Sequence, residues 1–546
     1  MAYRFSIILG AVLLAYGFLM FHLYQVQLVK GGYYLARAQS ELSGSGDASA
    51  NRGSIYFTDN KGNALPAAVN QESPVIYAVP SAIKNPATAA AAVAPILNIS
   101  EAKLAKLFSK PNDEYELLVK KADQTTADKI TALNITGVVA DYEPERFYPL
   151  GPVASQVLGY VGPSASSNAQ IGHYGIEGYY NTSLQNTTDV TLTIDPNVQI
   201  EAEKILDDLV AANGATGGSV IVEDPTTGQI IAMGGDPSFD PNEYASSSFA
   251  NFMNTDVQGV YEPGSIMKVI TMAAGIDAGK ITPNDTYTDH GELTINKAHI
   301  TNYDYTTHGA WGAGTTMTQV IEHSINTGAI YAENQTGNDI YLSYLKKFGF
   351  DQKTGIDLPG EVNGNLSQLT SNAPQIDWDT AAYGQGIAVT PIELMSAISA
   401  IANGGVLMRP YLNAALQPQE IRRVLSTTTA ATVSQMMLDA VDLAQVANIN
   451  GYAMAGKTGS AYVPNPAGGG YLNELNDSYI GFGPVSNPRF VAFIRLNTLP
   501  VTSLAAESVV PAFKQLSQFL INYYNIAPDR TTNDVIPNCK LLLCGQ

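Results

Sequence analysis

Segments with the pattern of β-strands lie in two groups far apart in the chain, and this separation limits how the chain can fold. The first group is 218–222 and 229–233, two apolar runs joined by the turn sequence DPTTG, which predicts a β-hairpin. The second group is 452–463, 478–485 and 489–497. This order fits one five-stranded antiparallel sheet whose strands come from both ends of a domain, with helices packed on it.

Helical segments are expected around these strands. Asp195 and Pro196 can cap a helix over 197–212, and a terminal amphipathic helix is expected over about 511–524. The stretch 240–450 between the two strand groups is expected to be largely helical. We therefore predict an α+β fold for a domain that spans 195–525, followed by a tail at 526–546.

The rest of the chain is long enough for a second domain, because 546 residues exceed the size of one ordinary core. Residues 29–185 are expected to form an elongated α+β domain. SPVIYAVP, ITGVVADYEPERFYP and ASQVLGYVG have the pattern of strands or strand-turn units. Helices are predicted for 86–107, interrupted by Pro95, and for 122–133.

Residues 5–24 (FSIILGAVLLAYGFLMFHLY) are almost entirely apolar, and about 20 such residues allow a helix to cross the hydrocarbon core of a membrane. A cleavable signal peptide is the competing interpretation, but the run is longer than an h-region and no small-x-small cleavage site follows it. We predict a single transmembrane helix, preceded by residues 1–4. Arg4 on one side, and Lys30 and Arg37 on the other, leave the charge bias nearly balanced, so orientation must come from other information.

The charge of the chain argues against nucleic acid as a partner. The sequence has 29 basic and 49 acidic residues, a formal net charge of −20, and no long basic run. The only cysteines, Cys539 and Cys544, can form a disulfide in an oxidising compartment or remain free thiols. Without nearby histidines they do not make a zinc site, which needs four ligands. We expect no metal and no cofactor.

Ser265 and Lys268 form a Ser-x-x-Lys sequence at the expected start of a helix. Pro263 and Gly264 predict a turn, and VITMAAGIDAG continues as a helix, so Lys268 lies one turn after Ser265 on the same face. A hydroxyl is a poor nucleophile at neutral pH and needs an adjacent base. Lys268 can be that base if burial and nearby positive charge lower its pKa enough to leave it neutral.

Two further short sequences follow in the same domain. Ser324-Ile325-Asn326 has a helical hairpin context, and Lys457-Thr458-Gly459-Ser460 lies within a predicted strand. Such short sequences recur by chance, here as Ser81/Lys84, Ser343/Lys346, Ser166/Asn168 and a second Lys-Thr-Gly at Lys353. These copies lack the context, because Ser81 precedes the domain, Ser343 lies within a regular helix, and Lys353 is followed by the loop sequence GIDLPGE.

With these three sequences the chain resembles the class B penicillin-binding proteins, which have a short cytoplasmic end, one membrane span, a pedestal domain and a transpeptidase domain. The resemblance covers nearly the whole chain and includes NRGSIY, ERFYP, ASQVLGYVG, GIEGYYN, DPTTGQIIAM, YEPGS, TGIDLPGE, YGQGIAVTP and FGPVSNPRFV. Three details depart from the family pattern. They are Ile325 where β-lactamases have Asp, Ser460 where Thr is commoner, and TDNKG where an Asp-Arg pair is usual.

The resemblance implies a peptidoglycan D,D-transpeptidase that is inhibited covalently by β-lactams. It assigns Ser265 as nucleophile, Lys268 as base, Ser324 as a proton relay oriented by Asn326, and Lys457 and Thr458 as ligands of the substrate carboxylate. Gly459 and Ser460, on the same strand, are also assigned to substrate binding. Backbone N–H groups of Ser265 and Ser460 would form the oxyanion hole. The implied setting is the outer face of a bacterial plasma membrane, with a membrane-embedded glycan polymerase and division proteins as partners.

Other functions fit parts of the same pattern. A serine β-lactamase needs a base that keeps a water reactive against the acyl-enzyme, and no segment between Ser324 and Lys457 is a convincing candidate. A β-lactam sensor usually has more membrane spans, and a noncatalytic division scaffold has no reason to keep all these polar side chains. The stretches around Lys457 and Gly481 favour septal synthesis over the elongation type.

Overall fold

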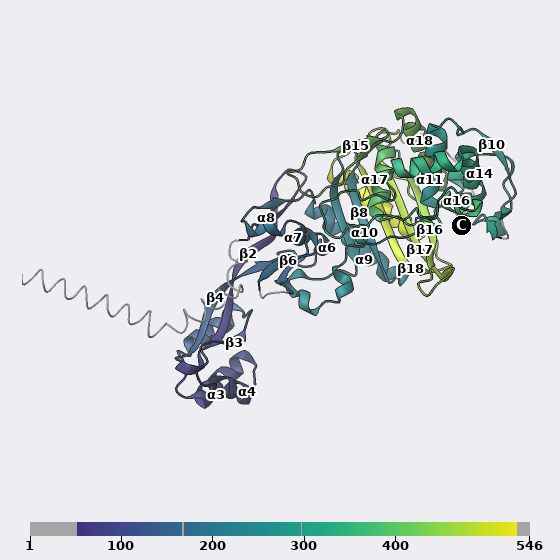
Figure 1. Cartoon of the computed structure of the whole chain (residues 1–546). Helices are drawn as coiled ribbons and strands as arrows, with labels where there is room; N and C mark the ends of the chain where they lie inside the picture. The colour runs from purple at the N-terminus through teal and green to yellow at the C-terminus, as the bar shows by residue number, and fades with distance from the viewer. Residues whose placement is uncertain (1–51, 166–168, 296–297, 532–546) are drawn as a thin grey trace, which may run out of the picture.

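The computed structural model describes residues 52–165, 169–295 and 298–531, and it shows a small body attached to one end of a larger one (Figure 1). We call residues 52–191 the pedestal and residues 195–531 the main domain; the pedestal includes the small body and also segments near 55–68 and 148–190, which share a hydrophobic core with the main domain. The predicted membrane span at 5–24 and the two cysteines, Cys539 and Cys544, lie outside the described residues. Within those residues, no helix has both the length and the apolarity needed to cross a membrane.

The main domain contains the five-stranded antiparallel sheet that the sequence predicts. The strand order is β16–β17–β18–β8–β9. The strands are β16 (Ala455–Pro464), β17 (Tyr471–Gly483), β18 (Phe490–Pro500), β8 (Gly217–Asp224) and β9 (Gln229–Asp236). Phe493 on β18 is opposite Ile221 on β8, so the two distant strand groups meet at the middle of the sheet.

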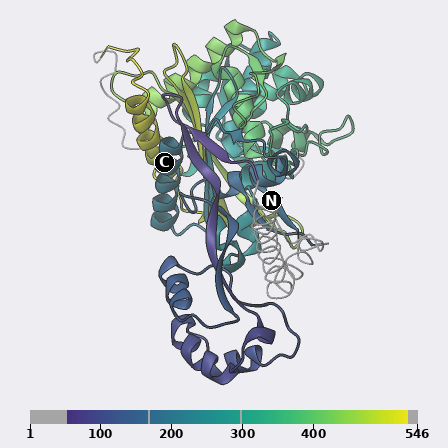
Figure 2. The same cartoon turned by 90° about the vertical axis from the view of Figure 1, so that its left-hand side faces the viewer.

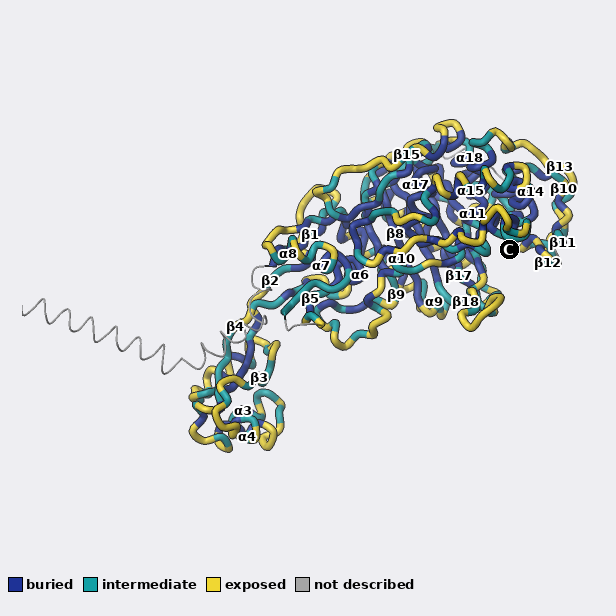
Figure 3. Tube along the Cα trace, in the orientation of Figure 1, coloured by how far each residue is buried: buried dark blue, intermediate teal, exposed yellow. Residues whose placement is uncertain are grey.

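Both faces of this sheet are buried. α9 (Pro196–Asn213) and α19 (Val509–Tyr523) cover one face, where Val220 and Ile494 join their core. The adjacent residues Ile221 and Phe493 belong to the core on the opposite face, because successive strand residues point to opposite sides. Figure 3 shows this buried interior around β8, α11 and α17. Helical layers on both sides explain why consecutive strand residues such as Val220 and Ile221 are both apolar and buried.

The middle of the chain is largely helical, as expected, and packs on the second face. Its helices are α10 (Thr255–Gln258), α11 (Met267–Asp277), α12 (Tyr305–His308), α13 (Met317–Glu322), α14 (Asn326–Thr336), α15 (Asn338–Lys347), α16 (Gln375–Ala381), α17 (Pro391–Ala402) and α18 (Thr427–Ala444). It also holds the antiparallel strand pairs β10 (Thr286–Asp289) with β13 (Gly312–Thr316), β11 (Glu292–Ile295) with β12 (Ala298–Thr301), and β14 (Val406–Met408) with β15 (Glu420–Arg423). Short 3₁₀ helices are η3 (Pro241–Ser246), η4 (Phe249–Phe252) and η5 (Gly264–Ile266).

The pedestal is organised along β2 (Ala64–Ala78), which runs between its outer end and the main domain (Figure 2). Around β2 lie β1 (Ile55–Thr58), β3 (Glu116–Val119), β4 (Val138–Phe147) and β7 (Val190–Thr191). The other pedestal elements are η2 (Pro80–Ala82), α3 (Pro86–Leu97), α4 (Glu101–Phe108), α5 (Gln124–Ala132), α6 (Ser155–Leu158), β5 (Tyr160–Pro163), β6 (Gln170–His173), α7 (Gly175–Tyr179) and α8 (Asn181–Gln185).

A buried carboxylate joins distant parts of the pedestal. Glu177 is completely buried and forms salt bridges of 2.6 Å with Arg52 and with Arg146. The Tyr148 hydroxyl also donates to Glu177, at 3.3 Å. A buried charge needs such partners, because it has lost its hydration.

Two pedestal predictions need correction. In ASQVLGYVG, the predicted strand begins only at Tyr160, and 155–158 form the helical turn α6. These residues are buried, and the Ala154 N–H donates to Glu203 of α9, so contacts with the main domain override the strand preference. The helix predicted for 86–107 does break, but at Asn98, whose φ is +53°, and Pro95 stays within α3.

Candidate active site

Ser265 lies in a turn that is held between two other segments. Gly264 has a φ of +56°, and a Cβ atom there would lie 2.5 Å from the carbonyl oxygen of Ser460. The Gly264 N–H donates to the carbonyl of Gly384 at 3.0 Å. η5 leads directly into α11, which places a half-buried Ser265 at the start of a helix, as predicted.

The residues before this turn are also anchored. Tyr261 and Val389 exchange backbone hydrogen bonds of 3.0 and 2.9 Å. The guanidinium of Arg495 on β18 lies 4.7 Å from the centre of the Tyr261 ring, a favourable cation–π distance. Strand β18 of the sheet therefore contacts the segment that precedes Ser265.

Lys268, one helical turn after Ser265, is completely buried. Its Nζ donates to the carbonyl oxygen of Ser324 and lies 3.2 Å from Ser324 Oγ. Burial lowers the pKa of Lys268 well below its ordinary value, and the charge of Lys457 lowers it further, while Asp304 acts in the opposite direction. This environment favours the neutral amine, the form that can accept a proton.

Ser324 has an unusual backbone conformation that places its hydroxyl between two lysines. Its φ is +55°, in a region that residues other than glycine seldom occupy. It connects α13 to α14, which is the helical hairpin that the sequence predicts. Lys457 Nζ donates to Ser324 Oγ at 2.9 Å, opposite the 3.2 Å contact from Lys268. Such strained residues are concentrated at functional sites.

Lys457 extends from the edge strand β16 and is also buried. Its Nζ contacts Ser324 Oγ and, at 3.2 Å each, the carbonyl and hydroxyl oxygens of Thr458. Burial lowers the pKa of Lys457 to about 7. None of these contacts in the described part of the chain is anionic, so below about pH 7 the Lys457 ammonium has no anionic partner there and can bind an anionic ligand.

Gly459 and Ser460 lie where β16 approaches the turn that contains Gly264 and Ser265. A Cβ atom on Gly459 would lie 2.6 Å from the Pro263 carbonyl oxygen, so only glycine permits this contact. The Ser460 hydroxyl is turned to Asp477 Oδ1, to which it donates at 2.6 Å. It is therefore the backbone of Ser460 that lies against Gly264.

Asn326 makes a different contact from the one expected. Its side-chain Nδ2 donates to the carbonyl oxygen of Thr301 at 2.8 Å, whereas the Ser324 hydroxyl contacts the two lysines. The role of Asn326 in orienting Ser324 stays a prediction. The sequence pattern did not single out Asp289, Asn302 or Trp311, which form a network beside this segment.

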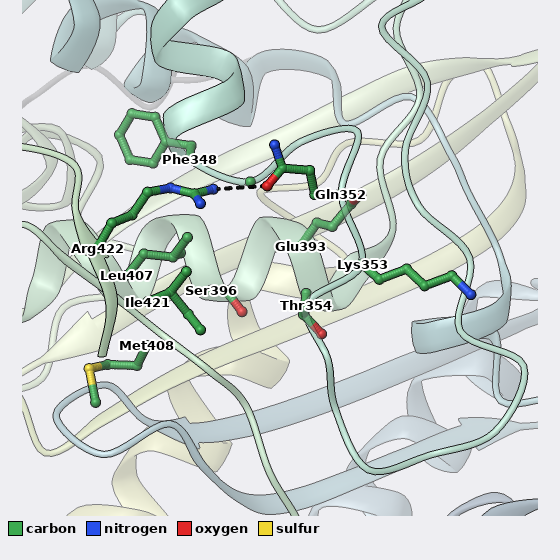
Figure 4. Close-up of a pocket in the computed structure, with 11 residues that line it drawn as sticks. Phe348, Gln352, Lys353, Thr354, Glu393, Ser396, Leu407, Met408, Ile421 and Arg422 are labelled. Atoms are coloured by element: carbon green, nitrogen blue, oxygen red, sulfur yellow. Dashed lines mark hydrogen bonds between the residues drawn. The ribbon is translucent and has the colours of Figure 1, made fainter. Parts of the chain in front are cut away.

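Two of the chance copies, at Ser343 and Lys353, lie away from this cluster, while Ser166/Asn168 falls outside the described residues. The Ser343 hydroxyl donates to the Ile340 carbonyl of its own helix at 2.7 Å. Lys353 lies in a loop, where it lines a pocket with Thr354, Glu393 and Ser396 (Figure 4). The described lining of this pocket includes none of the residues predicted for the active site.

The chemistry that this cluster can support is acyl transfer. It contains a helix-start hydroxyl, an amine whose environment favours the neutral form, a second hydroxyl in contact with that amine, and a second amine that can bind an anion. Within 52–165, 169–295 and 298–531, no three His, Cys, Asp or Glu side chains gather so that they could hold a metal ion.

Residues 218–518, which contain all of these side chains, match the family model of the penicillin binding protein transpeptidase domain. The chain belongs to this family. Residues 47–205 of this penicillin-binding protein match a second model, the penicillin-binding protein dimerisation domain. The combination of the two domains is that of a class B penicillin-binding protein.

Known proteins resemble this penicillin-binding protein along most of its length. It is 30% identical to stage V sporulation protein D of Bacillus subtilis, over 86% of this chain and 78% of that protein. It is 26% identical to the peptidoglycan D,D-transpeptidase FtsI of Escherichia coli, over 97% and 93%. The solved structure of penicillin binding protein 2X from Streptococcus thermophilus shares its fold, with a TM-score of 0.72 at 20% identity, over 87% and 80% of the two chains.

Proposed function

We propose that this penicillin-binding protein is a peptidoglycan D,D-transpeptidase that joins stem peptides through an acyl-enzyme on Ser265. The observation that carries the proposal is the position of Ser324 Oγ, 3.2 Å from Lys268 Nζ and 2.9 Å from Lys457 Nζ. The Ser324 hydroxyl thus connects Lys268, the base beside Ser265, to Lys457 on strand β16, which binds the substrate. The Escherichia coli relative, which bears the name of this activity, supports the choice of substrate.

In the acylation step, Ser265 Oγ attacks the carbonyl carbon of the penultimate D-Ala and its proton passes to the neutral Lys268 amine. Backbone N–H groups of Ser265 and Ser460 stabilise the oxyanion. The carbon–nitrogen bond then breaks, and the amine of the departing D-Ala takes a proton that Lys268 supplies through Ser324. The Lys457 ammonium and the Thr458 hydroxyl bind the terminal carboxylate of the substrate.

In the second step, an amine from a neighbouring stem peptide attacks the ester carbonyl. Lys268 takes a proton from this amine and returns one to Ser265 Oγ as the ester bond breaks, so an amide cross-link forms and the enzyme is restored. A β-lactam acylates Ser265 in the same way, but its leaving nitrogen stays attached through the opened ring. The acyl-enzyme from a β-lactam is therefore long-lived.

The test of the nucleophile is labelling with a fluorescent penicillin, followed by intact-mass measurement of the adduct. The wild type is expected to gain one label and Ser265→Ala none, while Lys268→Ala is slowed by at least about 10²-fold, the usual contribution of a general base. Ser343→Ala, in the chance copy of Ser-x-x-Lys, is the matched control and should label like the wild type. Labelling that persists in Ser265→Ala would exclude the assignment.

The location is part of the same proposal. Residues 5–24 would anchor the chain in the plasma membrane and place the main domain outside the cytoplasm, beside a membrane-embedded glycan polymerase and division proteins. Protease added to intact spheroplasts should then digest the main domain, and protection from the protease would contradict this orientation.

Similarity to FtsI favours septal synthesis. Depletion should then cause filamentation, whereas rounding of the cells would indicate elongation.

A further inference from the structure

We propose that Asp289 is a positioning residue that holds Ser324 in the conformation required for proton transfer during acylation. This inference rests on the proposed transpeptidase function. Asp289 ends β10, and its side chain is buried. It acts through the residues on either side of Ser324 rather than on the substrate.

Ser324 needs such support because its conformation is costly. A left-handed backbone at a residue other than glycine is sterically unfavourable, and it persists only when neighbouring structure enforces it. The hydroxyl must nevertheless stay between Lys268 and Lys457 to relay a proton. Whatever fixes the residues before and after Ser324 therefore controls the relay.

One oxygen of Asp289 fixes the chain after Ser324. Thr327, in the first turn of α14 and next to Asn326, donates its hydroxyl to Asp289 Oδ1 at 2.6 Å. Short hydrogen bonds from a hydroxyl to an ionised carboxylate are among the stronger ones in proteins. Thr327 is buried, so this bond does not compete with water.

The other oxygen fixes the chain before Ser324. The backbone N–H of Trp311 donates to Asp289 Oδ2 at 2.8 Å. The Trp311 ring stacks on His323, the residue before Ser324, with ring centres 3.7 Å apart, and on His308 at 3.8 Å.

Asn302 closes the network. It donates to Asp289 Oδ1 at 3.0 Å and accepts from the Thr327 N–H at 3.1 Å. The neighbouring Thr301 carbonyl holds Asn326 at 2.8 Å. Asp289 therefore fixes, through Asn302, the same segment whose Thr301 carbonyl accepts a hydrogen bond from Asn326.

The network requires an acceptor at this position. Burial opposes ionisation of Asp289, but hydrogen bonds from Thr327, Trp311 and Asn302 outweigh it and lower the pKa below the ordinary value. An ionised carboxylate only accepts, which suits all of these donors. An asparagine would have the same shape but would turn an amide N–H₂ toward at least one N–H or O–H group, leaving that donor unsatisfied.

The test compares Asp289→Asn with Asp285→Asn by stopped-flow acylation with a fluorescent penicillin. Asp285 is exposed, and in the described structure its carboxylate bonds only to Thr282, so it controls for the loss of one charge on the same segment. For Asp289→Asn, the first-order acylation rate should fall about 10²-fold, as expected for a displaced reacting group, with little change in the affinity of the noncovalent complex. Asp285→Asn should stay within about twofold of the wild type. A change in affinity alone would overturn the proposal.

A double-mutant cycle with Ser324→Ala distinguishes positioning from general loss of stability. In the Ser324→Ala background, Asp289→Asn should have at most about a threefold further effect, because the group that it positions is already absent. An equal effect in both backgrounds would overturn the proposal. If Asp289→Asn does not fold, Thr327→Val removes the hydroxyl that contacts Asp289, Asn302 and Tyr287, and an unchanged acylation rate in that variant would overturn the proposal as well. Failure of the wild type to label at Ser265 would instead reject the proposed function.

Discussion

Lys268 Nζ lies 3.2 Å from the hydroxyl of Ser324, a residue 56 positions later in the chain. The same amine donates to the Ser324 carbonyl oxygen. The proposed base and the proposed relay are thus in direct contact in this structure. Because Lys268 is buried, it also affects the free energy of unfolding, and this effect can be measured separately from the acylation rate.

Replacement of Lys268 by methionine should stabilise the protein at neutral pH while it abolishes acylation. Burial lowers the folded-state pKa of Lys268, so the unfolded chain binds more protons and the free energy of unfolding rises with pH up to the ordinary lysine pKa. At pH 7 we expect a gain of about 1–3 kcal/mol, the usual cost of an imperfectly solvated buried polar group. Urea unfolding at several pH values measures this gain, which should shrink as the pH rises.

Lys84→Met is the matched control for this experiment, because Lys84 belongs to a chance copy of Ser-x-x-Lys and is exposed. Its unfolding free energy should change by less than about 0.5 kcal/mol at every pH. Equal stability of wild type and Lys268→Met across the pH range would show that Lys268 is not held in the uncharged form.

The second-order rate constant of acylation should have a bell-shaped pH dependence. Burial lowers the pKa of Lys457 to about 7, so its ammonium is present below this pH and is lost as the pH rises through it. On the acid side the rate falls because Lys268 becomes protonated and no longer accepts the serine proton. The Lys457→Arg variant keeps its charge, so its slower acylation should lack the alkaline limb. An alkaline limb that survives in Lys457→Arg would assign it to another group.

Gly264→Ala should slow acylation by displacing the turn that carries Ser265. Its new Cβ atom would lie 2.5 Å from the Ser460 carbonyl oxygen, which forces the turn away from β16. We expect acylation to fall by about 10²-fold or more. Gly279→Ala is the control, because Gly279 also has a positive φ, of +65°, but nothing lies within 4 Å of the added atom. Gly279→Ala should cost about 1 kcal/mol in stability and leave acylation unchanged; similar rates for the two variants would contradict the clash.

Glu177→Gln should destabilise the pedestal without altering the chemistry at Ser265. The change leaves Arg52 and Arg146 buried without a counter-charge, which typically costs about 3–5 kcal/mol. Limited proteolysis should show faster cleavage in 52–191. Glu145→Gln, which removes a partly exposed pair with Lys121, should cost less than about 1 kcal/mol. Equal protease resistance of the two variants would argue against the buried cluster as a support of the pedestal.

Much of the fold follows from local sequence. The runs that form β8, β9 and β18 are apolar on both faces, and their order along the chain already indicates one sheet. Residues 155–158 show the limit of this reasoning. Their composition fits a strand, yet contacts with α9 and β9 hold them in a helical turn.

For the site, the sequence alone determined that Ser265 and Lys268 share a helix face, since 3.6 residues per turn is a local property. It also supplied the residues that meet them, Ser324 and Lys457. Only the tertiary structure decided that these side chains touch, that burial lowers the pKa of both lysines, and that Asp289 supports Ser324. Contacts and dielectric surroundings arise when distant segments pack together, so no local pattern can reveal them.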